Sequence, residues 1–237
     1  MHAVNGAFSK KWADVSKSCG KESIRTKFES GKAVNPDAVD KALSEDEYEA
    51  FCMVHNETST GTASDLEKIS KVMKRHPDVL WFVDAVSSLG GTKIEVDRLG
   101  IDICLASSQK AIALPPGLAV ASVGSRCYKK AESVAGRGYY FDILELKKSY
   151  DEDETPYTPS IPHLYALKKQ LERIEEEGLE NRFNRHKEMA EYTREWAKKN
   201  GFTMFSEEGH HSDTISCMVN TKNADFKAIK KGMASKG

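Results

Sequence analysis

Two side chains that could act together in catalysis each follow an apolar stretch of the sequence. Asp84 comes directly after Leu80–Val83, and Lys110 comes shortly after Ile101–Ala106. Both stretches have the length and the Val, Ile, Leu and Phe content of strands buried on both faces, as in a parallel sheet. Ligands of open α/β sheets bind outside the carboxyl ends of the strands. We therefore expect Asp84 and Lys110 to face one crevice.

A carboxylate and a lysine that face one crevice suit pyridoxal phosphate. The lysine amine can form a Schiff base with the aldehyde, and the carboxylate can pair with the protonated pyridine nitrogen, which keeps the ring an electron sink. Each residue alone also has an ordinary explanation, because a lysine after a strand is usually solvated and an aspartate there is often a turn or cap residue. The motifs around the two residues favour the first explanation.

Three segments, HNETSTGT (55–62), DAVSSLGG (84–91) and SSQKAIALPPG (107–117), resemble the signature segments of class V pyridoxal-phosphate-dependent aminotransferases. The resemblance runs without obvious gaps from Asn5 to about Asn220, and the most similar branch is the alanine–glyoxylate and serine–pyruvate type. It implies the α/β fold of fold type I, with a mainly parallel mixed sheet flanked by helices and the start of a small α+β C-terminal domain.

The same resemblance implies roles for residues of these motifs. Lys110 would be both the Schiff-base partner and the general acid/base, and Asp84 would hold the pyridine nitrogen. Thr58 takes the place of the hydroxyl residue that bonds the pyridoxal 3-oxygen. Gln109 is implied to help bind the cofactor phosphate.

Three further residues receive a role in the same way. Phe8 and Val86 are implied to lie against opposite faces of the ring, although Phe8 could also be a packed aromatic residue in the first turn of a helix. Thr158 lies in a Pro-rich link that, in the family, crosses to the other subunit and offers a hydroxyl to its cofactor phosphate. This implies a homodimer. A Pro-rich turn between domains would explain the same residues.

The implied activity is ping-pong transamination from a small amino acid such as alanine or serine to a 2-oxo acid such as glyoxylate or pyruvate. Relatives carry a phosphate-binding loop before the position of Asn5 and a carboxylate-binding arginine after that of Gly237. Neither can be placed here, so we expect a fragment that lacks both ends. Alternatives are an inactive cofactor-binding fragment, one half of a split enzyme, or a cysteine desulfurase, a branch that usually has His at the position of Gln109.

Apolar periodicity predicts the elements that position these residues. The first residues are expected to be the end of a strand, followed by a turn at Asn5-Gly6. The other expected strands cover residues 22–29, 50–54, 80–83, 101–106, 118–123, 202–205 and 214–219. The expected helices cover residues 8–19, 36–43, 64–75, 137–148, 162–177 and 180–199, with another from about 224. Ser64 is expected to cap the third of these helices, because Glu67 completes a capping box. We expect a large cofactor-binding domain over residues 1–149 and a link, helices and truncated small domain over 150–237.

Composition excludes several other classes of protein. The 35 Lys and Arg residues balance 36 Asp and Glu residues, which does not favour nucleic acid or an anionic membrane as a partner. The longest apolar runs fall well short of the ~20 residues of a membrane helix. The five cysteines contain no CxxC pair and the seven histidines show no metal-ligand spacing. We expect a cytoplasmic protein without a metal, with amino acid and 2-oxo acid substrates.

Overall fold

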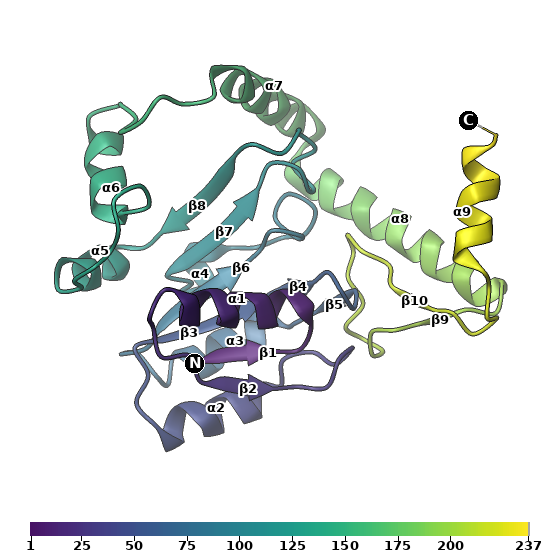
Figure 1. The fold of residues 1–237 in the computed structure, drawn as a ribbon, viewed down its shortest axis with the longest axis horizontal. Coiled ribbons are helices and arrows are strands. Elements are labelled where there is room, and N and C mark those ends of the chain that lie inside the picture. Colours follow the sequence, from purple (N-terminus) through teal and green to yellow (C-terminus); the bar gives the residue numbers. More distant parts are fainter. Residues whose placement is uncertain (237) are drawn as a thin grey trace.

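The computed structural model describes residues 1–236, so Gly237, the last residue of the expected second domain, lies outside it. Its centre is a six-stranded sheet with helices on both sides (Figure 1). Across the sheet the strands are β2 (Arg25–Lys27), β1 (His2–Val4), β3 (Ala50–Val54), β6 (Leu80–Asp84), β7 (Ile103–Ser107) and β8 (Ala119–Val123). Neighbouring strands are parallel, except that β8 runs antiparallel to β7. The predicted α/β fold with a mainly parallel mixed sheet is confirmed.

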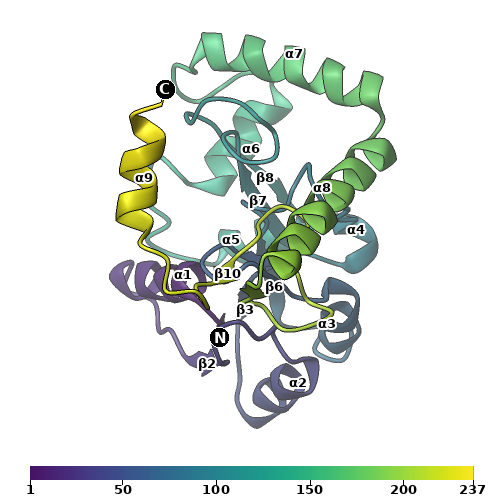
Figure 2. The ribbon, with the colours of Figure 1, turned by 90° about the vertical axis from the view of Figure 1, so that its right-hand side faces the viewer.

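The helices that flank the sheet are α1 (Ala7–Ser18), α2 (Pro36–Glu45), α3 (Leu66–Met73), α4 (Val96–Leu99), α5 (Ser125–Glu132) and α6 (Ile143–Asp151). Figure 2 shows α1 on one side of the sheet and α2, α3 and α4 on the other. Side chains alternate between the two faces of a strand. Phe51 and Met53 of β3 and Trp81 and Val83 of β6 are therefore buried in one core with Ile69 of α3. This shared core holds β3 and β6 in register.

The start of α3 differs from the prediction by one residue. Asp65 is the cap, and its carboxylate accepts the N–H of Lys68 at 3.0 Å. The prediction that Ser64 caps this helix is wrong. Ser64 is buried, and its hydroxyl accepts the N–H of Val34 at 3.1 Å. Its partner is therefore a distant segment and not the first turn of its own helix.

Several elements are shorter than predicted. The strands expected over 202–205 and 214–219 are reduced to Thr203–Met204 and Met218–Val219. The strand expected over 22–29 is reduced to the three residues of β2, because β2 is an outer strand that pairs only with the three residues of β1. The helix expected over 137–148 begins at Ile143 with Asp142 as its cap. Gly138, with a φ of +83°, has a left-handed backbone conformation that a right-handed helix cannot include.

The C-terminal part of the chain runs back against a loop at the end of β3. Its elements are α7 (Ile161–Glu177), α8 (Leu179–Lys199), β9 (Thr203–Met204), β10 (Met218–Val219) and α9 (Phe226–Ala234). A short ribbon of β4 (Asn56–Glu57) and β5 (Thr62–Ala63) follows β3. The N–H of Ala63 donates to the carbonyl of His210 at 2.9 Å, and the N–H of Ser212 donates to the carbonyl of Gly61 at 3.0 Å. Among the described helices, none combines the length and apolar character needed to cross a bilayer.

Candidate active site

Asp84 ends β6 and Lys110 follows the end of β7. These two strands are neighbours in the sheet (Figure 1). Asp84 is the last residue of β6, and β7 ends at Ser107, shortly before Lys110. In the parallel pairing of β6 with β7, Asp84 is opposite Leu105. Because parallel strands end at the same edge of a sheet, the structure brings Asp84 and Lys110 together at this edge.

Asp84 is partly buried, and its Oδ1 accepts the N–H of Val86 at 2.8 Å. Burial raises the pKa of Asp84, while the hydrogen bond from Val86 lowers it. The charge of Glu57 raises the same pKa and the charge of Lys110 lowers it, so both groups lie within electrostatic reach of Asp84. Among residues 1–236 only the N–H of Val86 hydrogen-bonds to this carboxylate. Its Oδ2 is therefore open to a cationic partner.

Lys110 opens a tight turn that the backbone and one serine hold together. The N–H of Ala113 donates to the carbonyl of Lys110 at 2.8 Å, and Ala113 itself has a φ of +61°. The buried hydroxyl of Ser108 donates to the carbonyl of Pro115 at 2.8 Å and so ties the start of the loop to its end. The side chains of Gln109 and Lys110 are exposed. The turn is thus fixed while both polar side chains remain accessible to a ligand.

A hydroxyl-rich loop after β4 contacts the loop that follows Asp84. Thr58 Oγ1 lies 2.5 Å from Ser87 Oγ, which is a hydrogen bond in which either hydroxyl can donate. Val86, next to Ser87, is half-buried. The contact between the two loops therefore brings Thr58 and Val86 beside Asp84.

Glu57 joins the start of α1 to the same hydroxyl-rich loop. It is fully buried, and its carboxylate accepts the N–H groups of Phe8 at 3.2 Å and Ser9 at 2.9 Å together with the Ser9 hydroxyl at 2.9 Å. From its own loop it accepts the N–H of Ser59 at 3.2 Å and the Ser59 hydroxyl at 2.6 Å. A Cβ at Gly6 would lie 2.4 Å from Glu57 Cδ, so only glycine allows this approach. Glu57 therefore holds Phe8 beside the loop that carries Thr58.

The pKa of Glu57 reflects this saturation with donors. Burial acts to raise the pKa, but hydrogen bonds from Ser59, Ser9 and Phe8 lower it below the usual glutamate value of 4.5. A carboxylate at a helix N-terminus also meets the positive end of the helix dipole. Glu57 is therefore a buried charge that hydrogen bonds from the surrounding fold stabilise.

Several polar residues at this edge receive no functional role from the sequence motifs. They include Glu57, Ser87 and Asn56. Asn56 Nδ2 donates to the carbonyl of Ser87 at 3.3 Å and to Thr214 Oγ1 at 3.0 Å. Its buried Oδ1 and the buried Oγ of Ser107 have no hydrogen-bond partner among the described residues. Polar residues that continue directly from a buried strand are the sequence signal that could have identified Asn56 and Glu57.

Thr158 does not belong to this group within one chain. It is exposed, in the link between α6 and α7, which runs on the β8 side of the sheet (Figure 1). Its neighbour Tyr157 donates its hydroxyl to the carbonyl of Tyr139 at 2.8 Å. In the described part of the chain no hydrogen bond links Thr158 to Asp84 or Lys110.

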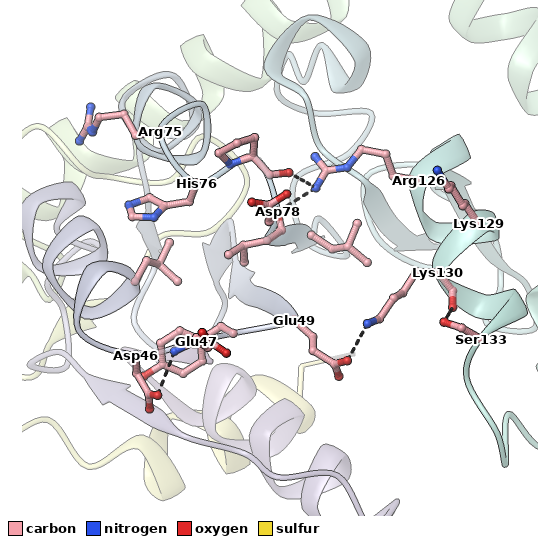
Figure 3. Close-up of a pocket in the computed structure, with 15 residues that line it drawn as sticks. Asp46, Glu47, Glu49, Arg75, His76, Asp78, Arg126, Lys129, Lys130 and Ser133 are labelled. Carbon is pink, nitrogen blue, oxygen red and sulfur yellow. Dashed lines mark hydrogen bonds and ion pairs between the residues drawn. The ribbon is translucent and has the colours of Figure 1, made fainter.

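A separate cavity of about 980 Å³ opens at the amino ends of β3 and β6 (Figure 3). Several of its charged side chains are already engaged. Lys130 pairs with Glu49 at 2.6 Å, and Arg126 donates to the carbonyls of Pro77 at 2.6 Å and Val79 at 3.2 Å. The length of β6, about 13 Å, separates this cavity from Asp84. We therefore centre the candidate site on the carboxyl edge.

Residues 4–237 match the family model described as aminotransferase class-V. The chain belongs to this family. It is 40% identical over 219 residues to an uncharacterized aminotransferase of Methanocaldococcus jannaschii, covering 91% of this chain and 57% of the relative. It is 35% identical over 240 residues to the serine–glyoxylate aminotransferase of Methylorubrum extorquens, covering 95% and 59%.

Among solved structures, the alanine–glyoxylate aminotransferase from Nostoc sp. matches with a TM-score of 0.92 at 26% identity, over 99% of this chain and 63% of that one. These likenesses agree with the predicted fold type I, and the enzymes of the family depend on pyridoxal phosphate. The chain spans less than 60% of the length of the two curated relatives.

Replacing Glu57 by Gln should destabilise the chain by about 2 kcal/mol at neutral pH. The amide NH₂ of Gln is a donor, and it would face N–H and hydroxyl donors whose hydrogen bonds a carboxylate oxygen now accepts. The folded-state pKa of Glu57 is lowered, so its stabilisation is complete above pH 4.5 and is lost as the pH falls below that value. Urea unfolding of the wild type and E57Q across this range measures the difference.

The matched control is Glu132→Gln on the exposed surface of α5, which should change the free energy of unfolding by less than about 0.5 kcal/mol. Equal stability of E57Q and the wild type at neutral pH would contradict the role given to Glu57. A difference that stays constant down to acid pH would do the same.

Proposed function

We propose that this chain is the catalytic core of a pyridoxal-phosphate-dependent aminotransferase that transfers an amino group from a small amino acid to a 2-oxo acid by a ping-pong mechanism. The observation that carries the proposal is the position of Asp84 and Lys110 at the ends of adjacent parallel strands, within electrostatic reach of one another. Relatives named serine–glyoxylate and alanine–glyoxylate aminotransferase support the substrate classes.

The environment of Asp84 fits a pyridoxal ring. Its carboxylate has an open Oδ2 and a pKa that burial raises, so a cationic ring N–H would supply the missing partner and favour the charged form. The buried Asn56 Oδ1 and Ser107 Oγ lack hydrogen-bond partners among the described residues. Asn56 comes shortly after the end of β3, and Ser107 is the last residue of β7, so both lie at the same edge of the sheet. These features support a polar ligand at this edge.

The cofactor, when bound, supplies an electron-withdrawing ring and an aldehyde. Asp84 would hold the ring nitrogen in its protonated form. Lys110 would hold the aldehyde carbon through its amine and would serve as the general acid/base at the substrate α-carbon. The exposed amine of Lys110 on a fixed turn is suited to both tasks.

The remaining proposed contacts surround these two groups. Thr58 would donate its hydroxyl to the 3-oxygen of the ring, and Gln109 would donate to the phosphate. Val86 and Phe8 would cover the two ring faces. The hydrogen bond between Thr58 and Ser87 and the Glu57 contact to the Phe8 N–H support this arrangement, because they hold α1 and both loops at one edge.

A cysteine desulfurase is the less favoured reading of the same fold. Such an enzyme needs a reactive thiolate, and burial raises the pKa of Cys52 to about 12 and those of Cys104 and Cys127 to about 11. Cys19 is exposed at the end of α1, and Cys217 is half-buried beside the carbonyl of Ser59. None of these positions favours a nucleophile on a mobile loop.

The proposal includes a homodimer in which Thr158 reaches the cofactor phosphate of the neighbouring subunit. Exposed aromatic residues beside this link support it: Tyr139 is 79% exposed, Phe141 77% and Tyr150 76%. A large domain over 1–149 followed by the start of a small one is also part of the proposal. A cytoplasmic location is consistent with five cysteines that are all free.

Incubation with pyridoxal phosphate followed by borohydride reduction should attach the cofactor covalently to Lys110, which mass spectrometry of peptides can locate. The variant Lys110→Ala should lose this adduct. Lys129→Ala, which removes an exposed lysine of α5, should keep it. An adduct spread evenly over surface lysines in the wild type would rule out the proposed site.

Addition of alanine or serine to the loaded protein should convert the cofactor from the aldehyde to the amine form, which its absorbance reports. In Asp84→Asn the conversion should slow about 100-fold, because the ring loses the charge that holds its proton. Asp97→Asn on α4 is the control and should convert as the wild type does. Binding without conversion in the wild type would instead favour the inactive fragment, and rescue by an added polypeptide would favour a split enzyme.

Sedimentation equilibrium should give the mass of a dimer for the wild type. Phe141→Asp places a charge among the exposed aromatic residues and should shift the equilibrium to monomer. Tyr192→Asp, at an equally exposed position on α8, should leave the dimer intact. A wild-type monomer at all concentrations would contradict the homodimer.

A further inference from the structure

Arg182 of α8 is a nearly buried cation, with an exposed fraction of 5%. Its Nε donates to the carbonyl of Gly90 at 2.8 Å, and its Nη2 donates to the carbonyl of Ala111 at 2.5 Å. Its Nη1 donates to Glu177 Oε2 at 2.9 Å. One guanidinium therefore links three separate segments of the chain.

The two carbonyls belong to the two loops that carry the proposed catalytic groups. Gly90 lies in the loop that begins after Asp84, and Ala111 is the residue after Lys110. A guanidinium presents its N–H groups in one rigid plane, so two carbonyls bonded to it are held at a fixed separation and angle. The relative placement of the two loops thus depends on one planar group.

Close packing at the same junction leaves little room for either loop to shift. A Cβ at Gly91 would lie 2.6 Å from Thr214 Cγ2, 3.1 Å from Ala111 Cβ and 3.2 Å from His186 Cδ2. The glycine thus allows the Asp84 loop to approach the Lys110 turn. Packing sets how near the two loops come, and the hydrogen bonds of Arg182 set their orientation.

A role limited to anchoring α8 explains these contacts less well. Apolar packing would fix a helix to its neighbours without the cost of burying a charge. Two of the three side-chain hydrogen bonds of Arg182 go to the carbonyls of the loops. Only the third, to Glu177, is made to a residue next to its own helix. The distribution of these bonds matches a group that orients the two loops.

The structure assigns to Arg182 the role of a positioning residue that sets the Lys110 amine against the Asp84 carboxylate. The assignment rests on the proposed function, since it concerns the same two groups. Arg182 contacts neither side chain directly and acts through the backbone on which each stands.

A matched control is available one turn further along α8. Arg185 also binds Glu177, with Nε donating to Oε1 at 2.5 Å and Nη2 donating to Oε2 at 3.1 Å, but it is half exposed and contacts neither loop. These two arginines lower the pKa of Glu177 to about 2, with Arg185 making the larger contribution. Arg185→Gln therefore removes a partner of Glu177 while leaving the two carbonyls bonded.

The experiment compares the wild type with Arg182→Lys, Arg182→Met and Arg185→Gln. Hydrogen exchange of the Gly91 and Ala113 amides, which close the two turns, reports loop order in the protein without cofactor. The rate of borohydride-trapped labelling of Lys110 by pyridoxal phosphate, relative to labelling of Lys129, reports the placement of the amine. The pH midpoint of the visible band of the bound cofactor reports the electrostatic coupling of Lys110 to Asp84.

We expect exchange at both turns to accelerate in the Arg182 variants. Selective labelling of Lys110 should fall about tenfold in Arg182→Lys, whose ammonium lacks the planar arrangement of donors that fixes the two carbonyls, and about 100-fold in Arg182→Met. The pH midpoint should move in Arg182→Lys and stay at the wild-type value in Arg185→Gln. If Arg182→Met does not fold, the folded Arg182→Lys protein decides the outcome.

Labelling, exchange and pH midpoint that are the same in Arg182→Lys and the wild type would overturn the assignment. Equal effects in Arg182→Lys and Arg185→Gln would also overturn it, because they would trace to Glu177. If Lys110 is labelled in the wild type and the variants give either of these two results, the assignment fails while the proposed function stands. If the wild type gives no label at Lys110, the proposed function fails and the assignment fails with it.

Discussion

The parallel pairing of β6 with β7 is the constraint on which the candidate site depends. It places the last residue of one strand and the loop after the other at the same edge of the sheet, so that an acid and an amine from separate segments lie at one edge. The pairing is supported by the core behind it, which contains Trp81 and Val83 of β6 together with Cys104 of β7. A single core therefore determines both the fold and the meeting of the two groups.

Strand pairing alone brings the two loops to one edge but does not orient them, and two buried charges complete the arrangement. Glu57 gathers N–H and hydroxyl donors from α1 and from its own loop, and Arg182 distributes its N–H groups to the carbonyls of two loops. Each is a charge that the interior tolerates because its hydrogen bonds are satisfied. The two residues have opposite charge. Glu57 accepts hydrogen bonds from the segments that it joins, and Arg182 donates hydrogen bonds to the segments that it joins.

The elements of the sheet and the positions of Asp84 and Lys110 could be predicted because apolar runs of strand length stand out in the sequence. The prediction of β3 over Ala50–Val54 agrees with the structure residue by residue. Glu57, Ser87 and Arg182 could not be found in this way. A polar side chain in the sequence looks the same whether it is solvated or buried, and the partners of Arg182 are 71 and 92 residues away. Ser64 was assigned to its own helix for the same reason, since its partner Val34 lies on another segment.

The two buried charges share a property that matters for any site that exchanges protons. A guanidinium keeps its charge across the whole range in which a protein stays folded. The pKa of Glu57 is lowered from its ordinary value of 4.5, so that carboxylate is ionised above pH 4.5. At neutral pH the carboxylate of Glu57 therefore keeps the N–H and hydroxyl donors that join α1 to its loop. The charge of Glu57 also raises the pKa of Asp84, so the carboxylate that shapes the site and the proposed catalytic acid are electrostatically coupled.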